Sequence, residues 1–141
     1  MSDNINFFSE EIDFKLEDET KTSLWLNLIS ENNNQIISNI NYVFCNDEYL
    51  LNINKEHLNH DYYTDIITFD LSDTNEIESD IFISIDRVKE NATNQNTSFV
   101  KELNRVLAHG LLHLIGYDDK TDDDKKIMRD KEDSCLSLLK K

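Results

Sequence analysis

Alternating apolar and polar positions in the chain predict a small β-sheet. Residues 36–45 alternate, with Ile36, Ile40, Tyr42 and Phe44 on one face and asparagines on the other, as in a half-buried strand. Residues 65–71 and 79–86 are rich in β-branched and aromatic side chains and predict two further strands. Two short apolar stretches near the start, 5–8 and 12–16, predict strands around a turn.

Apolar residues at helical spacing predict about five helices. The first covers residues 20–32, with Trp25 in or near the core and an apolar face formed largely by Leu24, Leu26, Leu28 and Ile29. Asn46 is placed to cap a second helix that ends near His57, and Asp86 to cap a short one that ends near Asn91. A last helix from Thr121 to about Lys140 begins with a capping-box pattern, in which Asp124 follows three residues after Thr121.

The strongest helical pattern covers residues 98–115. Its apolar stripe widens until the second half is apolar almost all round, which is typical of a buried helix. The chain has no proline, no repeat and no low-complexity linker. We therefore expect one domain over residues 1–141, of the α+β class: a small mixed sheet packed against about five helices, with a buried central helix.

Composition limits the classes of function. The net charge is −15, from 29 acidic and 14 basic residues, which excludes a protein that grips nucleic acid nonspecifically through a broad basic face. A role on RNA would need a local basic surface, a metal ion or a partner that supplies the affinity. The sequence shows no signal peptide and no apolar run near the roughly 18 residues of a membrane span, so we expect a cytoplasmic protein with Cys45 and Cys135 reduced.

The segment HGLLHLIGYDD, residues 109–119, carries the candidate chemistry and contains both glycines of the chain. His109 and His113 are four residues apart, so they project from one face of the buried helix and can reach one metal ion. Gly116 is placed to end the helix in a reversal that returns Asp119 to the histidines as a third ligand. Three protein ligands with an open position are typical of catalytic zinc. Gly110 lies within the helix, where glycine is unfavourable, and indicates that a neighbouring element or a substrate comes close to the helix at this point. The missing side chain leaves space beside the metal.

Simpler interpretations remain open for these residues. Two histidines at this spacing also occur as ordinary packing residues, and Asp119 also fits the acidic start of the last helix, where Asp118 is a rival ligand. His57 and His60 lie in a polar, aromatic segment that is either a surface loop or the frame of a substrate cleft.

The segment resembles the signature of the YbeY family of bacterial endoribonucleases, His-Gly-x-Leu-His-Leu-x-Gly-Tyr-Asp-His. It matches at every fixed position except the last, where Asp119 replaces histidine. INKEHLNHDYYTDIITFD and SDIFISIDRVKENA are similar to further family segments. The resemblance implies an α+β fold, one zinc ion on the three ligand positions, hydrolysis of phosphodiester bonds in ribosomal RNA, and association with the small ribosomal subunit.

Three positions depart from the family pattern. Asp119 stands at the third ligand and makes another divalent metal an alternative to zinc. Leu58 stands where the family has a loop arginine used against the phosphate, so the transition-state charge needs another donor, for which Lys55, His60 and the metal itself are the candidates. Ser79 stands where the family has a glycine.

Two other functions fit parts of the pattern. One is a non-catalytic, ribosome-associated assembly factor with a structural metal, which the loss of the loop arginine favours. The other is a metzincin-like peptidase, because His-x-x-x-His-x-x-Gly-x-x followed by a ligand matches that motif's spacing. The peptidase motif requires a glutamate general base directly after the first histidine, and this chain has Gly110 there.

Overall fold

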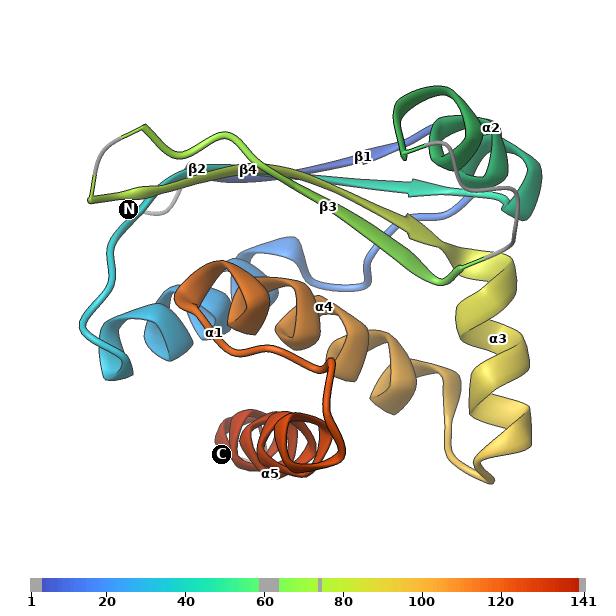
Figure 1. Ribbon diagram of the computed structural model, residues 1–141. Helices are drawn as coiled ribbons and strands as arrows, with labels where there is room; N and C mark the ends of the chain where they lie inside the picture. Colours follow the sequence, from blue (N-terminus) through green and yellow to red (C-terminus); the bar gives the residue numbers. More distant parts are fainter. Residues whose placement is uncertain (1–3, 59–63, 74, 140–141) are drawn as a thin grey trace.

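The structure is a computed structural model that describes residues 4–58, 64–73 and 75–139. Along the chain its elements are β1 (Ile5–Ser9), α1 (Glu19–Asn32), β2 (Ile37–Cys45), α2 (Asp47–Leu58), β3 (Ile66–Asp70), β4 (Ile77–Ser84), α3 (Ile85–Asn94), α4 (Phe99–Ile115) and α5 (Asp122–Leu138). A single mixed sheet is covered by helices (Figure 1), and the predicted α+β class is confirmed.

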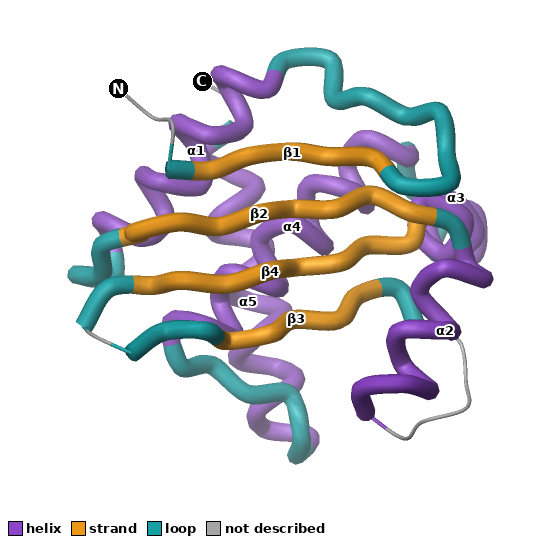
Figure 2. Tube along the Cα trace, turned by 90° about the horizontal axis from the view of Figure 1, so that it is seen from above, coloured by secondary structure: helices purple, strands orange, loops and turns teal. Residues whose placement is uncertain are grey.

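The sheet has the strand order β1-β2-β4-β3 (Figure 2). The strands β1, β2 and β4 run parallel, and β3 pairs antiparallel with β4 at the edge. Apolar and polar side chains alternate along the strands, so one face of the sheet is apolar and the other is polar, as expected for a half-buried sheet. The helix-covered face carries buried side chains such as Tyr42, Phe44 and Ile81, whereas the other face carries polar ones such as Asn41 and Asp80 and is covered only at one end, by α2.

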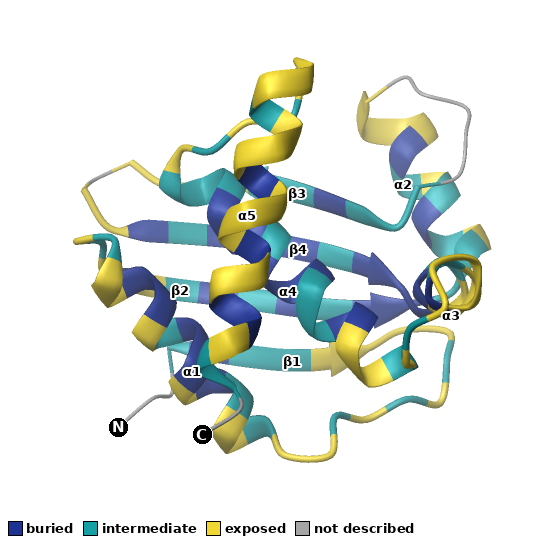
Figure 3. Ribbon diagram, turned by 90° about the horizontal axis from the view of Figure 1, so that it is seen from below, coloured by how far each residue is buried: buried dark blue, intermediate teal, exposed yellow. Residues whose placement is uncertain are grey.

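Helix α4 lies in the middle of the domain, between the sheet and α5 (Figures 1 and 3). Leu107, Leu111 and Leu112 are fully buried, so the prediction of a buried central helix is confirmed. The Tyr42 hydroxyl donates a 3.1 Å hydrogen bond to the Leu107 carbonyl and anchors α4 to the sheet. On the other side, the Trp25 indole donates a 2.8 Å bond to the Cys135 carbonyl and ties α1 to α5.

Several predicted caps and core residues are confirmed. Asn46 accepts a hydrogen bond from the Tyr49 backbone N–H at the start of α2. Thr121 and Asp124 form a complete capping box at the start of α5. Trp25 is buried, and both cysteines are buried free thiols. No helix within the described ranges is long and apolar enough to cross a membrane.

Other predictions of local structure are wrong. Residues 12–16 form no strand and instead belong to a loop that runs alongside the edge strand β1 (Figure 2), from which Phe14 packs against Phe44. On α1 the buried side chains are Trp25, Leu26 and Ile29, whereas Leu24 and Leu28, which were expected on the apolar face, are exposed. The sequence pattern could not separate the buried from the exposed residues, because the apolar side chains of α1 are spread over several sides of the helix.

Two boundaries also differ from the prediction. A register irregularity between Ile37 and Asn39 at the start of β2 buries Ile37 and leaves Ile36 exposed. The cap of α3 is Ser84, which accepts from the Arg87 backbone N–H, and not Asp86. Asp86 lies inside the first turn, where its carboxylate accepts from the Asp47 backbone N–H at the start of α2.

Gly110 is explained by the neighbouring strands. A Cβ atom at this position would lie 3.0 Å from Cδ1 of Ile66 and 3.3 Å from Cδ1 of Ile81, so the side chains of β3 and β4 occupy the space. Of the two explanations that the sequence left open, the structure therefore selects a neighbouring element. The close approach sets the distance between α4 and the edge of the sheet.

We expect Gly110→Ala to be strongly coupled to Ile66→Val, because the valine lacks the Cδ1 atom that the new methyl group would meet. The cost of the alanine should be smaller in the valine background by about 0.5–1.5 kcal/mol in the free energy of unfolding. Urea unfolding of the wild type, both single variants and the double variant measures this difference. Equal effects of the alanine in both backgrounds would contradict the packing explanation.

Candidate metal centre

The two histidines of α4 face each other on its last two turns. Their Nε2 atoms lie 3.0 Å apart and their rings meet edge to face, with centroids 4.6 Å apart. His109 and His113 are both half-buried, so the pair lies at the boundary between the core and solvent. The predicted i, i+4 geometry is thus present.

The end of α4 brings a carboxylate to the histidines. Gly116 has a φ of 128°, a conformation that side chains with a Cβ rarely adopt. Its N–H donates to the His113 carbonyl at 3.1 Å, and the next N–H, of Tyr117, reaches the Leu112 carbonyl at 3.0 Å, which closes the helix in a Schellman motif. After this reversal, Asp119 Oδ2 lies 3.3 Å from Nε2 of both His109 and His113.

The three side chains fit a small divalent cation. Two ligands on a tetrahedral ion with bonds of about 2.0–2.1 Å lie about 3.3 Å apart. The separations here are 3.0 Å between the two nitrogens and 3.3 Å from each nitrogen to the carboxylate oxygen. Across the described residues, these form the single group of three potential metal ligands. Asp118, the rival ligand, is exposed and lies outside this group.

A buried carboxylate of α5 contacts the far side of the His109 ring. Glu132 Oε2 lies 2.6 Å from His109 Nδ1, and Arg105 donates to the other oxygen, Oε1, at 2.9 Å. Burial alone raises the pKa of Glu132, but the hydrogen bonds from His109 and Arg105 outweigh burial and hold it below its ordinary value. Burial alone lowers the pKa of His109, and the bond and charge of Glu132 outweigh that effect and raise it.

The three side chains open onto a cleft of about 450 Å³ between the edge strand β3 and the end of α4. Its wall includes two carboxylates, Asp65 and Asp70, and two hydroxyls, Thr64 and Thr68. Burial raises the pKa of Asp65, and the nearby His109 lowers it in part. The described part of the lining contains no lysine or arginine.

The other candidates from the sequence lie elsewhere or outside the described residues. Lys55 and Leu58 are exposed on α2, on the opposite face of the sheet from α4 (Figure 1), and His60 lies outside the described residues. His57 contacts the Phe69 ring edge to face and lines a separate cleft with it. Ser79 is buried, and its hydroxyl donates to the Phe69 carbonyl at 2.6 Å, which joins β4 to the edge strand.

The sequence patterns predict no role at the site for Glu132 or Asp65. Glu132 shares the buried face of α5 with Met128, Cys135 and Leu136, so a charged residue within an apolar stripe was the available signal. Asp65 begins a strand, where an acidic residue is common, and nothing local distinguishes it from a surface residue.

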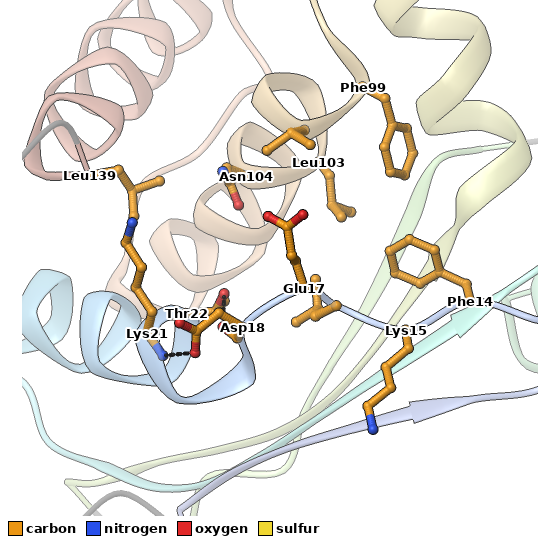
Figure 4. Close-up of a pocket in the computed structure, with 12 residues that line it drawn as sticks. Phe14, Lys15, Glu17, Asp18, Lys21, Thr22, Phe99, Leu103, Asn104 and Leu139 are labelled. Carbon is orange, nitrogen blue, oxygen red and sulfur yellow. Dashed lines mark hydrogen bonds between the residues drawn. The ribbon is translucent and has the colours of Figure 1, made fainter.

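A further cleft of about 370 Å³ lies between the loop before α1, the first turns of α4 and Leu139 (Figure 4). Phe14 and Phe99 meet edge to face on one side, with ring centroids 5.8 Å apart. On the other side, Asp18 caps α1 by accepting from the Lys21 backbone N–H. This cleft contains none of the three potential metal ligands, and its lining carries charges of both signs.

Comparison with known proteins points to one family. The family model described as endoribonuclease YbeY matches residues 4–140. The endoribonuclease YbeY of Cytophaga hutchinsonii is 54% identical over 139 residues, covering 98% of this chain and 97% of the relative. That of Flavobacterium johnsoniae is 50% identical, covering 94% and 95%. The solution structure of TM1509 from Thermotoga maritima superposes with a TM-score of 0.67 at 26% identity, covering 96% of this chain and 88% of that one.

We expect Gly116→Ala to lower the free energy of unfolding by about 1–2 kcal/mol, because alanine is strained at a φ of 128° although a Cβ atom there meets nothing within 4 Å. Urea unfolding measures the loss. Lys120→Ala, in the exposed loop after the turn, is the control and should change stability by less than about 0.5 kcal/mol. An alanine variant as stable as the wild type would show that the reversal does not depend on glycine.

Proposed function

The chain belongs to the YbeY family of endoribonucleases, and we propose that it is a metal-dependent endoribonuclease that hydrolyses phosphodiester bonds during the maturation of ribosomal RNA. One observation carries the metal dependence. His109, His113 and Asp119 place three ligand atoms within 4.8 Å of one another, at the positions where the motif carries its ligands.

One zinc ion suits this donor set, with another divalent metal as the alternative because one donor is a carboxylate. When bound, such an ion supplies Lewis acidity toward a phosphoryl oxygen and lowers the pKa of a coordinated water. The chain contributes two imidazole nitrogens and one carboxylate oxygen. The side chains leave the site open toward the cleft beside β3, where a substrate phosphate has access to it.

The electrostatics of the cleft require a cation for RNA to bind. Asp65 and Asp70 line the cleft together with Asp119, and the described lining offers no lysine or arginine to a phosphate. The chain as a whole carries a net charge of −15. We infer that the metal provides the local attraction for the scissile phosphate, and that a partner, the small ribosomal subunit, provides the remaining affinity.

The residue that stabilises the negative charge developing on the phosphate is not yet assigned. Leu58 replaces the arginine of the family pattern and cannot donate a hydrogen bond from its side chain. Lys55 and His60 stay predictions for this role. The missing arginine also supports the second candidate, an assembly factor whose metal is structural.

The peptidase alternative conflicts with the packing around α4. Its general base would stand at Gly110, where even a Cβ atom would lie 3.0 Å from Ile66. A glutamate at this position would have to displace the side chains of two strands. The absence of the base therefore follows from the way that α4 meets the sheet.

We expect the purified protein to cleave a single-stranded fragment of ribosomal RNA, to lose this activity on treatment with a chelator, and to regain it when zinc is added. Asp119→Ala should lower the rate by at least about a hundredfold, because it removes the charged ligand. Asp123→Ala, an exposed carboxylate in the first turn of α5, is the matched control and should keep the wild-type rate. Gel analysis of labelled RNA measures the rates.

Two outcomes would contradict the proposal. Cleavage that continues unchanged after the metal is removed would show that the three side chains do not form a catalytic metal site. A zinc-loaded wild type that cleaves no RNA, with an Asp119→Ala variant that melts at a lower temperature, would instead support the structural metal of an assembly factor.

A further inference from the structure

Glu132 is one of two acidic side chains that are buried among the described residues, the other being Glu102. Glu132 is 5% exposed and lies on the face of α5 that packs against α4. Burying a carboxylate is costly unless it is paired and hydrogen-bonded. Its presence there therefore calls for a specific explanation.

Each oxygen of the Glu132 carboxylate has its own partner. Oε1 accepts from Arg105 Nη1 at 2.9 Å, and Arg105 also donates to Asp133 at 2.8 Å. Oε2 faces His109 Nδ1 at 2.6 Å. The ion pair with Arg105 already connects α4 to α5, and it involves only the Oε1 atom of Glu132. The contact of Oε2 with His109 is additional and has the short distance of a charge-assisted hydrogen bond.

This contact decides which nitrogen of His109 carries the proton. A carboxylate accepts hydrogen bonds only, so Nδ1 must be the donor. A neutral imidazole has one donor and one acceptor nitrogen, and Nε2 then presents a lone pair. Nε2 is the nitrogen that lies 3.0 Å from Nε2 of His113 and 3.3 Å from Asp119 Oδ2. The ring thus points its lone pair at the position where a cation would lie.

We propose that Glu132 is a positioning residue of the metal centre: it holds the proton on His109 Nδ1 and orients Nε2 toward the metal, while Arg105 fixes the Glu132 carboxylate. The proposal rests on the metal site of the proposed function and adds a residue to it. Carboxylates that orient a ligand histidine in this way strengthen metal affinity about 10–100-fold in other proteins.

The decisive pair of variants is Glu132→Gln and Asp133→Asn. In the first, Arg105 requires the amide oxygen, so the amide NH₂ group faces His109 Nδ1. A donor there favours the ring form with its proton on Nε2, which blocks the metal. In the second, Arg105 loses one acidic partner, but Glu132 and its bond to His109 remain. The two variants make the same chemical change on adjacent residues, and only the first touches the ligand.

We expect Glu132→Gln to raise the zinc dissociation constant about 10–100-fold in a competition titration with a chromogenic chelator, and Asp133→Asn to change it less than about twofold. The visible absorption bands of the cobalt-loaded Glu132→Gln protein should shift, because one nitrogen donor is altered, and those of Asp133→Asn should not. Wild-type affinity and wild-type cobalt bands in a folded Glu132→Gln protein would overturn the proposal.

A measurement on the wild type keeps the test decisive if Glu132→Gln does not fold. Long-range ¹⁵N–¹H NMR of the zinc-loaded wild type should show the His109 proton on Nδ1 and zinc on Nε2, and zinc on Nδ1 would overturn the proposal. Failure of the proposed function would give a different result. In that case the wild-type protein itself would bind no zinc, independently of any change at Glu132.

Discussion

The geometry of the candidate site depends on the reversal of the chain at Gly116. Helix α4 is held from two sides, by the sheet and by α5, so the direction of its histidines is set by the core. The third donor lies outside that helix and reaches it only because the backbone turns back at a φ of 128°. The Schellman hydrogen bonds satisfy the last carbonyls of α4 and fix the turn. The same feature therefore ends a helix and completes a group of three potential metal ligands.

Local signals were sufficient to predict much of this arrangement. The spacing of His109 and His113, the helix-ending glycine and the following aspartate are all contained in one segment of 11 residues, 109–119. Their mutual distances follow from helix geometry and a standard helix end. The buried character of α4 was equally visible, because apolar residues occur on almost every side of its second half.

The failures share a cause, which is that they depend on contacts between distant segments. Ile36 and Ile37 are equally apolar, and only the pairing of β2 with β4 decides which is buried. Glu132 follows His109 by 23 residues, and its role depends on how α5 crosses α4. Leu24 and Leu28 are exposed because α1 turns another side toward the sheet. No periodicity within a single segment contains this information.

The positions of the potential metal ligands along the chain have a consequence for the stability of the folded protein. His109 lies on α4 and Asp119 in the connection that leads to α5, so a cation at the site would fasten this connection to the central helix, next to the direct contact of Glu132 with His109. Ligands that bind only the folded state add to its stability in proportion to the logarithm of their free concentration. A metal-loaded protein would therefore unfold less often than a metal-free one.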